Sequence, residues 1–234
     1  MVTEISQRVS AGVDRLDQLL GGGLPRQSIV VVGGLPGSGK STLAFHMMAE
    51  AVCRGAGAML VTTTHQPTSK LRAQYNRLNF LGPTGVFDYF DFLELDNNIM
   101  KQDASAQNEA LVRLLNAVVG RVQEKAVGIV AIDSFRAITD VAESKGQVWR
   151  FLGALSAHLI ARDCIGVLLG EYLLPRDLDV PELAMADVVI YLEVDRLVSA
   201  DVRTLRVYKV RGGSYTEGRQ AFNITEDGIN FLGG

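Results

Sequence analysis

The sequence has little cysteine, little net charge and no long apolar run, and each absence excludes a class of protein. Cys53 and Cys164 are the two cysteines among 234 residues, and their wide separation fits neither a disulfide framework nor a four-ligand zinc site. The formal net charge of −3 gives no sign of a nucleic-acid or anionic-membrane partner. The N-terminal residues contain no apolar signal segment, and no apolar run approaches the ~20 residues that span a bilayer. We therefore expect a cytoplasmic protein that does not enter a membrane.

What the sequence does contain is an alternation of short apolar runs with stretches of helical periodicity. This pattern is typical of βα units around a largely parallel sheet. We expect strands near residues 29–33, 58–63, 86–92, 127–132 and 164–169, and helices near residues 40–53, 68–79, 104–124 and 147–162.

The pattern changes after residue 187 to consecutive strands near residues 188–194, 202–210 and 219–224. We predict that these strands form an antiparallel addition to the sheet edge. No repeat or long linker is visible, so residues 1–234 are predicted to form a single α/β domain.

An apolar strand runs directly into a glycine-rich loop. Residues 34–41 read GLPGSGKS, which matches the pattern G-x-x-x-x-G-K-[ST] of phosphate-binding loops. Glycines let successive backbone N–H groups turn toward phosphate oxygens, Lys40 supplies a cation for the β- and γ-phosphates, and Ser41 supplies a hydroxyl for Mg²⁺. The helix that follows points its positive end at the same phosphates. The nucleotide-binding residues predicted here are Gly34, Pro36, Gly37, Ser38, Gly39, Lys40, Ser41 and Thr42.

A second nucleotide signal is the apolar run at residues 127–132, which ends on Asp133. A strand of this kind places its carboxylate at the carboxyl edge of the sheet, where open α/β folds bind ligands. Asp133 or Ser134 would also be an ordinary cap for the next helix. Because a phosphate loop lies upstream, we favour the metal role and predict that Ser41 and Asp133 hold Mg²⁺.

These motifs and three further segments resemble the KaiC-like ATPases of the RecA superfamily, a group that also includes RadA-type recombinase paralogues. The segments are VSAGVDRLDQLLGGGLP at residues 9–25, KVRGG at residues 209–213 and FNITEDGI at residues 222–229. The resemblance covers almost the whole chain. It implies a RecA-like P-loop fold with a mainly parallel central sheet, flanking helices and antiparallel C-terminal strands. It also implies that ATP and Mg²⁺ bind at the subunit interfaces of a homo-oligomer, expected to be a hexameric ring.

The resemblance gives Lys209 and Arg211 a role across a subunit boundary, where both would reach the γ-phosphate of a neighbour's ATP. The catalytic set that it implies is Lys40, Asp133, Lys209 and Arg211. From the residues alone, a solvated basic edge strand is the alternative. Ser214 fits the family pattern that follows, whereas Tyr215 replaces the family's histidine and would contact ribose or base.

The chain departs from KaiC-like hydrolases after its second strand, where they carry two adjacent glutamates. Thr64 and His65 occupy those positions. A threonine hydroxyl is not a general base near neutral pH, and general-base help is typically worth ~10²- to 10⁴-fold in rate. We therefore expect slow or absent ATP hydrolysis, with His65 or Glu171 as candidate substitute bases. Leu183 and Ala184 stand where autophosphorylating relatives carry a Ser-Thr pair, so autokinase activity is not expected.

Two functions remain open from the sequence. We favour a nucleotide-gated signalling or assembly subunit with an unidentified protein partner. The alternative is a RadA- or RecA-like protein that binds single-stranded DNA through residues 139–150 and 171–187. Both segments mix acidic with basic residues and lack the cation and aromatic pattern typical of single-strand binding, so a nucleic-acid partner is not expected.

Overall fold

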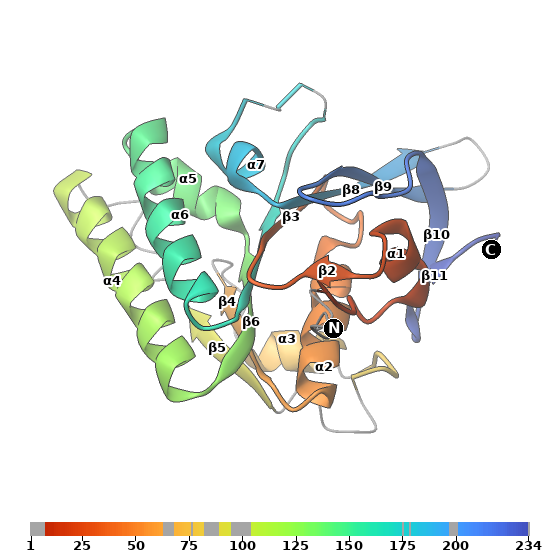
Figure 1. Ribbon diagram of the computed structural model, residues 1–234, viewed down its shortest axis with the longest axis horizontal. Coiled ribbons are helices and arrows are strands. Elements are labelled where there is room, and N and C mark those ends of the chain that lie inside the picture. The colour runs from red at the N-terminus through yellow and green to blue at the C-terminus, as the bar shows by residue number, and fades with distance from the viewer. Residues whose placement is uncertain are drawn as a thin grey trace, which may run out of the picture.

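The computed structural model describes residues 8–62, 68–75, 77–81, 89–94, 104–174, 176–177, 179–196 and 201–233. A nine-stranded sheet dominates these residues, with the strand order β11-β10-β9-β8-β3-β7-β6-β4-β5 (Figure 1). The strands are β3 (Ile29–Gly34), β4 (Gly57–Thr62), β5 (Phe90–Glu94), β6 (Val127–Asp133), β7 (Ile165–Gly170), β8 (Val188–Arg196), β9 (Asp201–Val210), β10 (Arg219–Thr225) and β11 (Gly228–Phe231). A separate two-stranded sheet pairs β1 (Arg8–Val9) with β2 (Leu24–Pro25).

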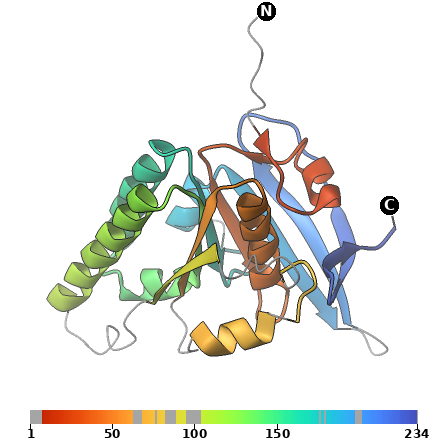
Figure 2. The same cartoon turned by 90° about the horizontal axis from the view of Figure 1, so that it is seen from below.

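Helices cover both faces of the large sheet (Figures 1 and 2). They are α1 (Asp14–Leu19), α2 (Lys40–Cys53), α3 (Thr68–Tyr75), α4 (Ala104–Glu124), α5 (Phe135–Val141), α6 (Lys145–Ile160) and α7 (Pro181–Met185). In the described part of the chain, no helix is both long enough and apolar enough to cross a membrane.

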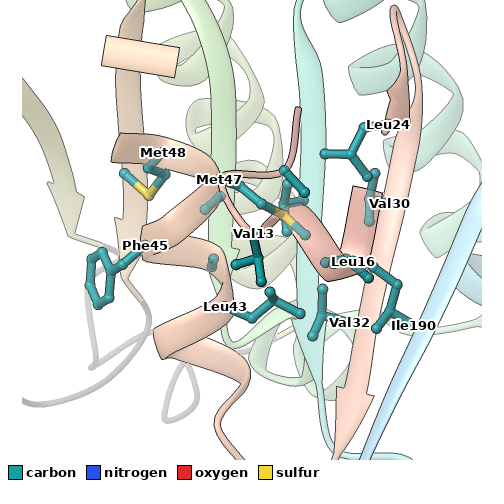
Figure 3. Close-up of a cluster of buried hydrophobic side chains, with 14 of the residues drawn as sticks. Val13, Leu16, Leu24, Val30, Val32, Leu43, Phe45, Met47, Met48 and Ile190 are labelled. Atoms are coloured by element: carbon teal, nitrogen blue, oxygen red, sulfur yellow. The ribbon is translucent and has the colours of Figure 1, made fainter. Parts of the chain in front are cut away.

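The core lies in two layers, one on each face of the sheet. On one face, side chains of α1 and α2 such as Leu16, Leu43 and Met47 pack against Val30 and Val32 of β3 (Figure 3). The other face of β3 presents Val31 to a layer that α4, α5 and α6 complete. Because β3 is buried on both faces, its sequence is continuously apolar rather than alternating.

The structure confirms the predicted fold class and refines its antiparallel part. Every hydrogen-bonded pair within the set β3 to β8 is parallel. The antiparallel pairs begin with β8 and β9. The three predicted C-terminal strands do pair antiparallel with one another, and β8 joins them to the parallel part of the sheet by pairing in parallel with β3 through Val188 and Val30. The chain makes this crossover from β7 to β8 through α7, which is too short at five residues to leave a helical period in the sequence.

Other element boundaries differ in detail. The described part of the strand predicted at residues 86–92 is β5, which runs to Glu94, and residues 86–88 lie outside the described residues. Helix α3 ends at Tyr75, before the predicted residue 79, and α1, α5 and α7 were not predicted. Helix α6 begins at Lys145 because Ser144 caps it by accepting a hydrogen bond from Gln147 N.

Candidate nucleotide-binding site

The glycine-rich loop joins the carboxyl end of β3 to the start of α2, and its glycines adopt conformations that other residues avoid. Gly34, Gly37 and Gly39 have φ values of 150°, 80° and 106°. A Cβ at Gly34 would lie 2.3 Å from the carbonyl oxygen of Leu192 and 2.6 Å from Ser38 Oγ. A Cβ at Gly37 would meet nothing within 4 Å, so this side of the loop is open. The loop is thus tightly packed on its inner side and accessible on its outer side.

Lys40 folds back over this loop. Its ammonium donates hydrogen bonds to the carbonyl oxygens of Gly34, at 2.8 Å, and Leu35, at 3.1 Å. Burial lowers the pKa of Lys40, whereas the nearby carboxylates of Glu171 and Asp133 oppose this change. The ammonium is therefore held at the loop, where a bound phosphate would supply a stronger partner than two carbonyls.

Ser41 and Asp133 lie together although they are far apart in the sequence. Ser41 Oγ donates to Asp133 Oδ2 at 2.6 Å. Burial raises the pKa of Asp133, and the bond from Ser41 and the charge of Lys40 oppose this rise. Ser134 caps α5 by accepting a hydrogen bond from Arg136 N, so Asp133 is not needed as the cap. The structure therefore assigns capping to Ser134 and leaves the Asp133 carboxylate at the loop.

The residues at this point fit a magnesium nucleotide. Hydroxyl and carboxylate oxygens, the donors of Ser41 and Asp133, are ligands that Mg²⁺ prefers. Ser38 Oγ is fully buried in the loop and has no hydrogen-bond partner among the described residues. Together with the open outer side of the loop, these groups form a site of the right chemistry for phosphate and its metal.

Lys40, Ser41 and Asp133 line a pocket of about 270 Å³ at the carboxyl edge of the sheet. One wall is apolar and is formed by Phe45, Leu60, Leu71 and Tyr75. Glu171, which directly follows β7, contributes a carboxylate to the same pocket. Thr64 and His65, the positions expected to differ from family hydrolases, lie outside the described residues.

Sequence reasoning missed two residues at this site. Tyr75 lines the pocket together with Ser41. Arg203, near the start of β9, donates to the carbonyl oxygen of Gly37 at 3.3 Å. Neither residue belongs to a sequence motif. Arg203 lies close to the loop after β3 because the strand order places β9 next to β8, which is the neighbour of β3.

Lys209 and Arg211 lie at the opposite edge of the sheet from the loop of their own chain. The end of β9 is level with the start of β8, where Val210 pairs with Val188, and Val188 in turn pairs with Val30 near the start of β3. The loop instead follows the end of β3. Neither cation can therefore reach its own chain's loop.

Both cations are held at the carboxyl end of α7. Lys209 Nζ donates to the carbonyl oxygens of Leu183, at 3.3 Å, and Ala184, at 3.1 Å. Arg211 donates to Ala184 O at 3.4 Å and to Asp187 Oδ1 at 3.3 Å. These bonds are consistent with a favourable interaction between cations and the negative end of a helix.

Ser214 and Tyr215 also lie away from the pocket of their own chain. A Cβ at Gly21 would lie 2.5 Å from the carbonyl oxygen of Ser214, so this segment packs against the turn after α1. The Tyr215 hydroxyl donates to Tyr208 O at 3.1 Å. The predicted contacts of these two residues with nucleotide therefore stay predictions about a neighbouring subunit.

Comparison with known proteins identifies the family. A family model described as "ATPase: KaiC" matches residues 9–233. The chain belongs to the KaiC ATPase family. Membership implies that the KaiC-type domain binds a nucleotide and, together with the RecA relatives, places it in the RecA superfamily.

Several curated proteins are similar to this chain. A UPF0273 protein of Methanopyrus kandleri is 26% identical over 95% of this chain and 91% of its own length. Protein RecA of Rippkaea orientalis is 32% identical over 67% of this chain, and the match covers 39% of that protein. A chloroplastic DNA repair protein recA homolog of Arabidopsis thaliana is 30% identical over 65% of this chain and 30% of its own length. The chain thus spans well under half the length of the RecA proteins that it matches.

Proposed function

We propose that residues 1–234 form one KaiC-type domain that binds Mg·ATP at the subunit interfaces of a homo-oligomeric ring, a hexamer, and that ATP serves chiefly as an assembly signal. The observation that carries this proposal is the position of Lys209 and Arg211 at the sheet edge opposite to the phosphate loop of their own chain. Cations at that edge can contact an ATP bound by a neighbour, and their charge would then link ATP occupancy to assembly. In this proposal the protein is a cytoplasmic signalling or assembly subunit that presents the ring to a protein partner.

Slow or absent hydrolysis is the second part of the proposal. Among the described residues that line the pocket, the carboxylates belong to Asp133 and Glu171. Asp133 is bonded to Ser41, which leaves Glu171 as the acid that would have to activate water there. Because Thr64 and His65 replace the acidic pair of family hydrolases, we propose that bound ATP persists long enough to stabilise the assembly.

Sedimentation velocity with Mg·ATP, with Mg·ADP and without nucleotide tests the assembly. The wild-type protein should sediment as a larger species with Mg·ATP, and Lys209→Ala combined with Arg211→Ala should abolish that change. Arg113→Ala with Lys125→Ala is the matched control, because it also removes two exposed cations, here from α4 and from the residue that follows it. Assembly of the Lys209 and Arg211 variant equal to that of wild type would contradict the proposal.

Phosphate release is followed in the same samples. Turnover should stay far below that of KaiC-type proteins that carry the acidic pair. Brisk hydrolysis that disappears in Lys40→Ala would refute the sensing role and would make the protein an ordinary ATPase.

The likeness to RecA proteins favours a second candidate function, ATP-dependent binding of single-stranded DNA. The charges of the described residues argue against it, since two cations in or just before the first candidate segment are paired with acids. Arg136 lies 2.9 Å from Asp140 and Lys145 lies 3.0 Å from Asp179. Anisotropy of a labelled oligothymidine, titrated with the protein and Mg·ATP at two salt concentrations, separates the candidates. Tight binding that weakens steeply with salt would favour the RecA-like function.

A further inference from the structure

A buried acid in α7 has no role in the nucleotide site described above. Glu182 is 2% exposed, and a carboxylate at such a position is costly unless specific partners hold it. Its Oε1 accepts a hydrogen bond of 3.0 Å from the Tyr172 hydroxyl. Its Oε2 has no hydrogen-bond partner within the described residues. The first turn of α7 is thus attached to Tyr172 by one buried bond.

Tyr172 packs against the end of β3, at the point where the phosphate loop begins. A Cβ at Gly33, the residue before the loop, would lie 3.1 Å from Tyr172 Cδ2, and a Cβ at Gly170 would lie 2.5 Å from the same ring. Both glycines therefore make room for this side chain. The preceding residue, Glu171, is exposed and lines the nucleotide pocket, whereas Tyr172 is buried. Any movement of the loop stem or of Glu171 on nucleotide binding would act on Tyr172.

The other end of α7 holds the two cations that the proposed function requires. The carbonyl oxygen of Ala184 accepts hydrogen bonds from both Lys209 and Arg211. Glu182 and Ala184 are two residues apart in one short helix, so a shift of the first displaces the second. To reach a phosphate in a neighbouring subunit, the cations must exchange these carbonyls for the new partner.

We propose that Tyr172 and Glu182 are positioning residues that connect the phosphate loop of one chain to Lys209 and Arg211 of the same chain. Nucleotide in the loop moves Tyr172, Tyr172 moves α7 through Glu182, and α7 then releases the cations toward the neighbour's ATP. The inference rests on the proposed function, in which these cations act across the interface. Its consequence is cooperativity, because a subunit that has bound ATP becomes better able to contact the ATP of the next subunit.

The test compares Tyr172→Phe, which removes the hydroxyl, with Glu182→Gln, which keeps an acceptor oxygen for it. Assembly is measured as a function of ATP concentration. Tyr172→Phe should shift the midpoint by about fivefold or more and bring the Hill coefficient close to 1. Glu182→Gln should behave nearly as wild type, and Tyr89→Phe, at a tyrosine that is 68% exposed, is the matched control. Equilibrium dialysis in a background of Lys209→Ala with Arg211→Ala measures ATP affinity without assembly, and Tyr172→Phe should leave it unchanged.

A second measurement, acetylation of Lys209 by acetic anhydride, does not depend on assembly. In dilute protein ATP should increase the labelling of Lys209 in wild type but not in Tyr172→Phe, with Lys125 as internal reference. If wild type assembles but Tyr172→Phe has an unchanged midpoint, Hill coefficient and labelling, the link through Glu182 is overturned while the proposed function stands. If wild type does not assemble, the proposed function fails, and the labelling alone decides whether the link exists. The link would also be overturned if Tyr172→Phe lost ATP affinity in the non-assembling background by the same factor as it shifts the assembly midpoint. Such a loss would place the effect of Tyr172 at the loop itself.

Discussion

A buried histidine in α2 should make the stability of the fold depend on pH below neutrality. His46 is 7% exposed, and its Nε2 accepts a hydrogen bond of 3.0 Å from Ile229 N in β11. Its ring stacks on Phe80 with a centroid distance of 3.8 Å. Burial lowers the pKa of His46 from 6.5 to about 4, although a hydrogen bond with the backbone of Gly12 opposes this change. His46 thus connects the helix after the phosphate loop to the two ends of the described chain in its neutral form.

The size of the effect follows from the two pKa values. Each pH unit between them is worth roughly 1.4 kcal/mol, so the gap from 6.5 to about 4 corresponds to about 3 kcal/mol. Above pH 6.5 both the folded and the unfolded chain carry a neutral residue, and the full stability is present. Between pH 6.5 and 4 the unfolded chain binds the proton and the folded chain does not, so the free energy of unfolding decreases as the pH is lowered. Below pH 4 both states are protonated and this contribution changes no further.

Urea unfolding at several pH values from 7.5 to 4 measures the effect. The free energy of unfolding of wild type should fall by about 3 kcal/mol more than that of His46→Gln, whose side-chain oxygen can accept the bond from Ile229 N without titrating. His158→Gln, at an exposed histidine of α6, is the control and should retain the wild-type pH dependence. Parallel curves for wild type and His46→Gln would show that His46 does not cause the pH dependence, whatever the stability of the variant at pH 7.5.

Three further substitutions probe the loop and the strand residue before it. Lys40→Ala should weaken ATP binding about tenfold or more, because a charged hydrogen bond to phosphate is lost, while the urea midpoint stays close to wild type; equilibrium dialysis and unfolding check the two halves. Ser41→Ala should bring the ATP affinity with Mg²⁺ close to that with EDTA, and a retained metal dependence in calorimetry would remove Ser41 from the site. Gly33→Ala should destabilise the fold by about 1–3 kcal/mol in urea, since its Cβ would lie 3.0 Å from Tyr191 and 3.1 Å from Tyr172, and an unchanged midpoint would contradict this packing.

Much of the fold follows from local sequence patterns. The run of β-branched residues at the start of β3 predicts a buried strand, and the glycines at 34, 37 and 39 predict a turn that only residues free of a Cβ adopt easily. The parallel pairing of β8 with β3 did not follow, because a strand's own sequence does not say which strand it pairs with or in which direction that partner runs. The pairing of Val188 with Val30 depends on a crossover through α7, which has no periodicity to detect.

The candidate site likewise contains some residues that were predicted from the sequence and others that were not. Lys40, Ser41 and Asp133 were predicted because each belongs to a motif whose neighbours in the sequence give its context, and the structure brings them together. Tyr75 and Arg203 were missed because their proximity to the loop arises from strand order and helix placement rather than from a motif. Ionic or hydrogen-bonding side chains that reach a site from a distant strand are visible only once the topology is known.

Strand β9 gives the structural reason for proposing a closed ring. Arg203 near its start contacts the loop of its own chain, and Lys209 near its end lies at the opposite sheet edge, a span of about 20 Å for six residues of strand. In a head-to-tail assembly, the loop of each subunit would meet the cations of the next, and repetition of that interface gives either a closed ring or an open helix. An open chain leaves one terminal loop without cations from a neighbour, whereas a ring leaves none. If ATP binding in every subunit contributes to assembly, closure is the arrangement in which no bound ATP lacks its contacts.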